Sequence, residues 1–337
     1  MDSLHLFSSL CRAAGRTLVR RVRHGPLRPG WTYAFEAFIA FAGSRPPMRD
    51  AASTQAFRRT MEKMSPGALP ASVVTRTRVD AGGVPATWMT PVTGSGGTVV
   101  LFLHGGAYVS GSAEQYRSFC GQMARDTGTR VLVPDYRLAP EHPYPAGLED
   151  ALAVWKWLRS TGVEPSRIVV AGDSAGGGLA LALLVALVEA GEPMPVGAVL
   201  LSPWVDLACE APSHEENAAY DFLNREQLLT WARFYAGGLK LEDPRVSPLR
   251  ASLRGLPPLF LQSGGAELFR DAVGELAERA RAAGVPVTLD VCENLPHVPC
   301  AFGAMLPASQ AAYTRAIEAL RRMVEGAERA ASAKAAG

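Results

Sequence analysis

The sequence lacks the features that mark several classes of protein. It has only five cysteines among 337 residues, an odd number with no C-x-x-C spacing, so neither a disulfide framework nor a zinc site is expected. The formal net charge is only +2, which gives no reason to expect nucleic acid as a partner. It has neither an apolar run long enough to span a bilayer nor a clean secretory leader pattern. A reducing, cytoplasmic location fits these absences best.

Charge is uneven only near the N-terminal end. Residues 11–30 contain six arginines and no acidic residue. The simpler interpretation is a solvated basic helix face, and the alternative is weak contact with an anionic membrane surface. Residues 31–42, WTYAFEAFIAFA, are apolar but too few to cross a bilayer, so they are expected to form a helix that packs over another part of the protein.

Short apolar runs organise the middle of the chain. They occupy residues 98–104, 130–136, 167–173, 197–203, 258–264 and 285–291, and helical stretches are expected near 115–127, 146–159, 175–190, 266–283 and 308–329. Runs that are apolar on both faces are typical of parallel strands covered by helices. The alternation therefore predicts a doubly wound α/β fold, preceded by a hairpin over 72–79 and 83–91. Residues 204–257 interrupt the alternation, and an excursion this long is typical of a lid or a substrate-binding segment.

Residues 172–176, Gly-Asp-Ser-Ala-Gly, stand at a strand-to-helix corner. A P-loop would need Lys-Ser or Lys-Thr after its second glycine, and a dinucleotide site would need G-x-G-x-x-G, so neither pattern fits. The spacing does match G-x-S-x-G, in which a sharp turn with small neighbours exposes a serine hydroxyl as a nucleophile. A purely structural alternative is that Ser174 only caps the following helix.

A serine nucleophile needs a base, and the base needs an orienting acid. His297 follows the last apolar run, and no other histidine occurs after residue 214, so we assign it as the base. Residues 264–271, GGAELFRD, offer two acids. We assign Glu267, where the loop leaves the sheet, and keep Asp271 as the alternative, because an acid in the first turn of a helix is already explained by the helix dipole. The resulting order of serine, acid and histidine is that of α/β-hydrolases.

An acyl-transfer site also needs aligned backbone N–H groups that stabilise an oxyanion. Residues 104–107, His-Gly-Gly-Ala, follow an early strand and supply small residues at Gly105, Gly106 and Ala107. The N–H of Ala175, next to the proposed nucleophile, would complete an oxyanion hole. His-Gly-Gly alone could be a plain glycine turn, but together with G-x-S-x-G it becomes a specific signal.

Taken together, these segments resemble the hormone-sensitive-lipase-like esterases of the α/β-hydrolase fold. The matching segments are HGGAYVSGS (104–112), DYRLAPE (135–141), GDSAGGGLA (172–180), SPWVDL (202–207), DPRVSPL (243–249), GGAELFRD (264–271) and LPHV (295–298). The resemblance implies an α/β-hydrolase with a mostly parallel central sheet, helices on both faces and a helical cap. It implies one domain over 1–337, with a catalytic core at about 70–330 and cap elements at about 1–65 and 204–245.

The resemblance also assigns roles. It implies a catalytic triad of Ser174, Glu267 and His297, with Gly106, Ala107 and Ala175 as oxyanion donors and Gly105 mainly supporting the turn. Two departures occur: Ala107 stands where the family usually has a third glycine, and Glu267 stands where many members have Asp. The aromatic residues considered as pocket lining are Tyr108, Trp204, Phe222 and Phe234, although core packing is the more common role of an aromatic residue.

We therefore expect a carboxylic-ester hydrolase that acts on small, short- to medium-chain acyl esters through an acyl-serine, without a metal or organic cofactor. An acyltransferase that uses the same acyl-serine is the first alternative. A non-catalytic receptor for a small ligand is the second, because plant gibberellin receptors resemble this family; those receptors lack the catalytic histidine that is present here. Members of the family often form homodimers through an exposed edge strand, so the resemblance makes a homodimer one option and leaves the oligomeric state open.

Overall fold

The structure is a computed structural model that describes residues 3–44, 48, 50–64, 67–94 and 97–336. Within these residues, one sheet holds the strands in the order β1-β2-β4-β3-β5-β6-β7-β8. The strands are β1 Val74–Asp80, β2 Pro85–Pro91, β3 Val99–Leu103, β4 Arg130–Pro134, β5 Ile168–Asp173, β6 Gly197–Leu201, β7 Leu259–Gly264 and β8 Val287–Cys292. Strand β2 is antiparallel to β1 and β4, and the other neighbouring strands are parallel. The predicted hairpin and mostly parallel sheet are confirmed.

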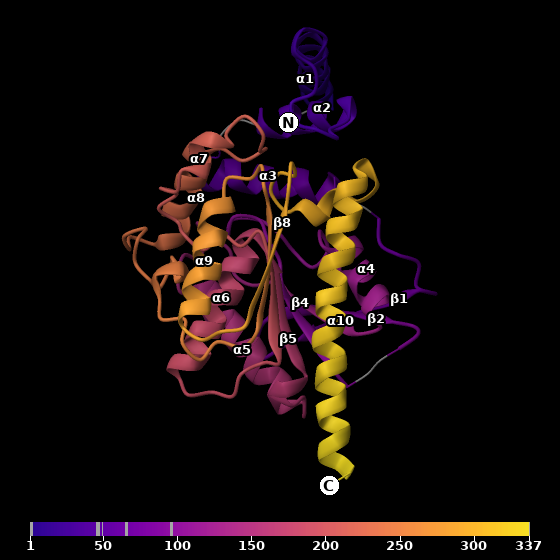
Figure 1. The fold of residues 1–337 in the computed structure, drawn as a ribbon, viewed down its shortest axis with the longest axis vertical. Helices are drawn as coiled ribbons and strands as arrows, with labels where there is room; N and C mark the ends of the chain where they lie inside the picture. Colours follow the sequence, from indigo (N-terminus) through magenta and orange to yellow (C-terminus); the bar gives the residue numbers. More distant parts are fainter. Residues whose placement is uncertain (1–2, 45–47, 49, 65–66, 95–96, 337) are drawn as a thin grey trace.

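Helices cover both faces of this sheet (Figure 1). They are α4 Arg117–Thr127, α5 Ala146–Ser160, α6 Ser174–Glu189, α9 Arg270–Ala282 and α10 Pro307–Ala336. In β5, Ile168 and Val170 join the core cluster that includes α5, α6 and α9, whereas Val169 and Ala171 join the cluster that includes α4 and α10. Successive side chains of a strand point to opposite faces, so a strand buried on both sides is apolar throughout. Helix α10 continues beyond its predicted end at 329 through an alanine-rich stretch that favours helix.

The remaining helices gather at the end of the sheet where the parallel strands terminate, with α1 and α2 outermost (Figure 1). They are α1 Ser3–His24, α2 Tyr33–Gly43, α3 Ala51–Met64, α7 Ser213–Glu216 and α8 Arg225–Ala236. The Thr32 hydroxyl caps α2 by accepting the N–H of Phe35, and α2 buries Phe35, Ile39 and Phe41. The indole N–H of Trp31 donates to the carbonyl of Asn294 at 2.5 Å. The apolar segment 31–42 therefore forms a packed helix, as predicted.

Short 3-10 helices and a contact of α3 complete the framework around the site. The 3-10 helices lie at Pro165–Arg167, Pro248–Arg250 and Pro299–Met305. The Arg58 guanidinium on α3 donates to the carbonyls of Val109 and Ala139, so α3 is tied to the loop that follows β3. Among the described residues, no helix has both the length and the apolar character needed to cross a membrane.

Candidate active site

Ser174 lies at the turn between β5 and α6. Its φ is +53°, a left-handed conformation that is uncommon for any residue except glycine. Strain of this kind costs roughly 1–3 kcal/mol and persists only where the surroundings enforce it. Glycine is required beside it, because a Cβ at Gly176 would lie 2.1 Å from the carbonyl oxygen of Leu103. The crowded backbone thus holds the serine hydroxyl outside the sheet.

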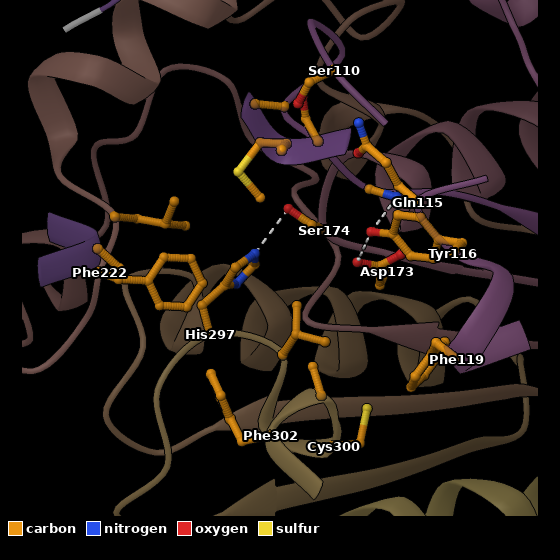
Figure 2. Close-up of a pocket in the computed structure, with 18 of the residues that line it drawn as sticks. Ser110, Gln115, Tyr116, Phe119, Asp173, Ser174, Phe222, His297, Cys300 and Phe302 are labelled. Atoms are coloured by element: carbon orange, nitrogen blue, oxygen red, sulfur yellow. Dashed lines mark hydrogen bonds between the residues drawn. The ribbon is translucent and has the colours of Figure 1, made fainter. Parts of the chain in front are cut away.

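His297 lies in the loop after β8 and points its imidazole at the serine (Figure 2). Its Nε2 is 2.8 Å from the Oγ of Ser174, although 123 residues separate the two along the chain. The ring is buried, with Phe269 packed edge-on against it at a centroid distance of 4.9 Å. Burial lowers the pKa of His297 to about 3, so the resting imidazole is neutral and can accept a proton.

Glu267 lies on the other side of the same imidazole. Its Oε2 is 3.9 Å from Nδ1 of His297, beyond hydrogen-bond range, and Nδ1 has no other partner in the described part of the chain. The carboxylate accepts hydrogen bonds from the hydroxyls of Ser202 and Ser263 and from the N–H of Gly264. Burial raises its pKa to about 8 against the effect of these donors. A shift of about 1 Å would close the gap to Nδ1, and such gaps are common in sites without substrate.

Asp271, the alternative acid, does not face the histidine. It lies in the first turn of α9, where its carboxylate accepts the N–H of Ser213 at 2.8 Å and pairs with Arg270 at 2.7 Å. These partners hold the start of α7 against α9. The geometry therefore places Glu267, and not Asp271, beside His297.

The loop after β3 lies beside Ser174, and the backbone N–H of Gly105 in this loop already has hydrogen-bond partners. The N–H of Gly105 donates to the Asp173 carboxylate at 2.9 Å and to the Tyr116 hydroxyl at 3.0 Å. The Tyr116 hydroxyl in turn donates to Asp173 at 2.7 Å (Figure 2). Gly105 therefore supports the turn, the role that the resemblance implied, and does not point its N–H into the oxyanion hole: its amide fastens the loop to the residue that precedes the serine.

The other three predicted donors keep free amides. Within the described residues, the N–H groups of Gly106 and Ala107 donate to no protein acceptor. Ala175 lies in the first turn of α6, where backbone N–H groups have no partner within the helix. Gly106 has a φ of +123°, and a Cβ there would lie 2.2 Å from the carbonyl oxygen of Ser110, so the loop requires glycine at this position.

A cavity of about 640 Å³ opens over Ser174 and His297. On the cap side its wall includes Phe38, Phe57 and Trp231, and on the other side Phe119, Phe302 and Tyr313. Of the four aromatic residues predicted to line it, Trp204 and Phe222 do so. Tyr108 does not, because its ring is buried and stacked on Tyr235 at 3.8 Å. Phe234 does not either, because it packs against the main core cluster.

Sequence reasoning missed Ser202, which connects the acid and the histidine loop. Its hydroxyl donates to Oε2 of Glu267 at 2.6 Å and accepts the N–H of Val298 at 3.0 Å. Its φ is +46°, so Ser202, like Ser174, Ala107 and Val298, is a left-handed non-glycine residue in the site. Ser202 directly follows β6, as Ser174 follows β5, so the rule that located the nucleophile could also have located this residue.

Asp221 is the second residue that the sequence did not indicate. It is buried in the excursion between β6 and β7, where its carboxylate accepts the N–H groups of Leu268 at 3.0 Å and Leu223 at 3.3 Å. The backbone N–H of His297 also favours its ionised form, and Glu267 is an acidic neighbour. Asp221 thus fastens its segment to the loop of the acid and interacts electrostatically with that of the base. No periodicity or spacing in this stretch of the sequence predicts that role.

Asp221 gives a prediction about stability and pH. Burial raises its pKa to about 7 from 3.8, so the folded state prefers the protonated form. A raised carboxyl pKa stabilises the fold fully at low pH, and this contribution is lost as the pH rises through about 7. We expect the unfolding free energy of the wild type to fall more steeply between about pH 4.5 and 7.5 than that of Asp221→Asn. Urea denaturation across this range measures both slopes, and parallel curves would contradict the prediction.

Comparison with known proteins shows that the chain is similar to hydrolases. A sequence family described as having the α/β-hydrolase fold matches residues 100–301. An acetyl-hydrolase of Streptomyces hygroscopicus is 40% identical over 253 residues, which cover 75% of this chain and 81% of the relative. The esterase LipI of Mycobacterium tuberculosis is 37% identical over 235 residues, covering 68% of this chain and 73% of the relative.

Solved structures agree with the sequence comparison. A mutant of the esterase E40 superimposes with a TM-score of 0.79 at 42% identity, covering 84% of this chain and 94% of that one. An esterase from the bacterial hormone-sensitive lipase family superimposes with a TM-score of 0.73 at 38% identity, covering 94% of this chain and 98% of that one. The likeness therefore extends over most of the chain.

Proposed function

The chain belongs to the hormone-sensitive-lipase-like esterases of the α/β-hydrolase fold and is a carboxylic-ester hydrolase, and on this premise we propose that Ser174, His297 and Glu267 perform the hydrolysis. The observation that carries the proposal is the 2.8 Å contact between Nε2 of His297 and Oγ of Ser174. A neutral imidazole in hydrogen-bond contact with a serine hydroxyl is the arrangement needed for general-base activation of a nucleophile.

In the acylation half of the reaction, Oγ of Ser174 attacks the ester carbonyl while its proton moves to Nε2 of His297. The carbonyl oxygen becomes an oxyanion, and the free N–H groups of Gly106, Ala107 and Ala175 are placed to stabilise it. Removing one such donor typically slows acyl transfer by roughly a hundredfold or more. The imidazolium then returns its proton to the leaving alcohol, and the acyl-serine remains.

Deacylation reverses these roles with water as the nucleophile. His297 takes a proton from the water, the same amides hold the second oxyanion, and Ser174 leaves with its proton restored. In each half-reaction the imidazole becomes a cation. As the imidazole becomes a cation, its charge favours the ionised form of Glu267, whose carboxylate would stabilise the cation and fix the tautomer with Nδ1 protonated once the 3.9 Å gap closes. Every step uses side chains and backbone of this chain together with water.

Replacing each acidic residue in turn should show whether Glu267 or Asp271 supports His297. We expect Glu267→Ala to lower kcat by about 10³- to 10⁴-fold, because the imidazole then loses the charge that orients and stabilises it. Asp271→Asn should change kcat less than about tenfold, because that side chain joins α7 to α9. Steady-state rates with an aryl acetate measure both variants. A larger loss in Asp271→Asn than in Glu267→Ala would reverse the assignment.

We propose short- to medium-chain acyl esters as substrates. A cavity of about 640 Å³ with mostly aromatic and aliphatic walls suits a small neutral ester, and the cap helices close one side of it. With aryl esters of increasing acyl length, kcat/KM is expected to peak among chains of about two to eight carbons and to be at least about tenfold lower for chains of twelve or more. A rate that rises steadily to the longest chains would overturn this preference.

We also propose a cytoplasmic location and a homodimer. All five cysteines are free thiols, which suits a reducing compartment. Strand β8 ends the sheet order, and Val291 on it is exposed, so its open edge could pair with that of a second copy. Light scattering after size exclusion measures the mass in solution, and a monomer at high protein concentration would contradict the pairing.

A further inference from the structure

Helix α1 has two faces of different character, and the inner one is anchored to the rest of the protein. Ala13 and Thr17 are buried on this face. Arg20 and Arg21 form ion pairs with Glu36 of α2, whose side chain is fully buried. A buried carboxylate needs such partners, because leaving its charge unpaired would be costly. The orientation of α1 about its own axis is therefore fixed, and with it the face that points away from the protein.

The outer face carries an apolar stripe beside a basic one. Cys11, Gly15, Leu18 and Val22 follow one another at helical spacing, and Leu18 and Val22 expose 53% and 80% of their surface. The neighbouring row is Arg12, Arg16, Val19 and Arg23, all of them exposed. Within the described chain, none of these three arginines contacts an acidic side chain, and α1 itself contains no acidic residue. Large apolar side chains and arginines without an acidic partner thus share one face of α1. Helix α1 itself lies at the outer end of the molecule (Figure 1).

We propose that this outer face of α1 binds the surface of an anionic lipid bilayer. A helix lying in the plane of the interface buries its apolar stripe at the boundary between headgroups and acyl chains, while adjacent arginines contact lipid phosphates. Each basic side chain near an anionic bilayer adds to the attraction, and the effect weakens with salt. Leu18 and Val22 supply the apolar stripe, and Arg12, Arg16 and Arg23, which have no acidic partner, supply the basic side chains.

Other occupants fit the face less well. A second copy of α1 would bring one row of arginines near another, and like charges in contact repel. A nucleic acid would use the arginines but would leave Leu18 and Val22 exposed to water. An anionic lipid surface satisfies both stripes at once.

The position of α1 beside α2 also has a consequence for the active site. Helix α2 holds α1 through Glu36 and contributes Phe38 and Ala42 to the wall of the cavity over Ser174. Docking through α1 would thus bring the cap side of the cavity close to a bilayer. This consequence rests on the proposed hydrolase mechanism, whereas the docking itself does not.

Vesicle flotation of the full-length protein tests the proposal. Vesicles of phosphatidylcholine alone are compared with vesicles that also contain phosphatidylglycerol, at low and at high salt. The wild type is expected to float with the anionic vesicles at low salt and to remain unbound to the neutral ones. The same measurement with Ser174→Ala protein prevents hydrolysis of lipid esters, so a failure of the catalytic proposal leaves the binding result intact.

Two variants of α1 and one matched control make the test specific. The triple variant Arg12→Gln/Arg16→Gln/Arg23→Gln should bind anionic vesicles at least about tenfold more weakly. Leu18→Asn/Val22→Asn should also weaken binding by about tenfold, because its apolar stripe is gone. The control changes three exposed basic residues elsewhere and lowers the net charge equally: Lys156→Gln/Lys240→Gln/Arg254→Gln. It should bind like the wild type.

Turnover of a water-soluble ester, unchanged in every α1 variant, shows that these proteins are folded. Four results would overturn the proposal: no flotation of the wild type, equal binding to neutral vesicles, equal loss in the control, or a dimer that the α1 substitutions convert to monomer. Binding that falls in both α1 variants and not in the control supports it.

Discussion

Replacing Ser174 by alanine is expected to abolish ester turnover and leave the fold intact. The variant lacks the oxygen that forms the acyl-enzyme, so kcat should fall by at least about 10⁴-fold. The low activity that remains would come from the oxyanion donors and from substrate binding alone. Alanine has the same backbone limits as serine at a φ of +53°, so the turn gains no new strain. Initial rates with an aryl acetate and a thermal melt of the same sample measure the two effects.

A second serine in the same cavity provides the control. Ser118 lies on the cavity wall and accepts a hydrogen bond from Gln122, but it does not contact His297. Ser118→Ala should therefore retain kcat within about threefold. Activity of Ser174→Ala close to that of the wild type would remove the acyl-serine mechanism altogether. A melting temperature far below that of the wild type would show instead that the loss reflects unfolding.

His297→Ala is expected to be nearly as damaging. Without the imidazole, no side chain among the described residues is in hydrogen-bond contact with Oγ to take the serine proton, so kcat should again fall by about 10⁴-fold or more. Because serine and base act as one unit, Ser174→Ala/His297→Ala should be hardly slower than either single variant. Steady-state rates of the three proteins complete this double-mutant cycle.

His142 is the matched histidine for this cycle. It is exposed, and in the described residues its ring makes no polar contact with the site. His142→Ala should keep wild-type kcat within about threefold. If the losses in Ser174→Ala and His297→Ala multiplied in the double variant, the two residues would be acting independently, and the pairing across 2.8 Å would have no catalytic meaning.

The sheet was predictable because each of its central strands is an uninterrupted apolar run that can be recognised in the sequence alone. A strand such as β3, buried on both faces, must be apolar at every position, and such a run is visible in the sequence. The helices between the runs follow from the same alternation. In the excursion at 204–257 the helix at 224–236 was predictable and corresponds to α8, whereas α7 and the path of the chain were not, because they are held by contacts with distant segments, including those of Ser213 and Asp221.

The candidate site was predictable wherever one topological rule applies. Functional side chains in open α/β sheets follow the carboxyl ends of strands, and Ser174, Glu267 and His297 follow β5, β7 and β8. Ser202 obeys the same rule and was still missed, because a lone serine after a strand carries no motif. Asp221 obeys no such rule, since it reaches the site from an excursion.

The sequence by itself determined which residue types stand after which strands, because strand spacing and the order of serine, acid and histidine are properties of the chain. Only the tertiary structure decided which atoms meet. In the folded protein the amide of Gly105 donates to Asp173, and Tyr108 stacks on Tyr235 away from the cavity. Asp271 accepts a hydrogen bond from the first residue of α7 and does not face His297. The physical reason is that contacts between segments far apart in the chain depend on packing and loop paths, and local propensity encodes neither.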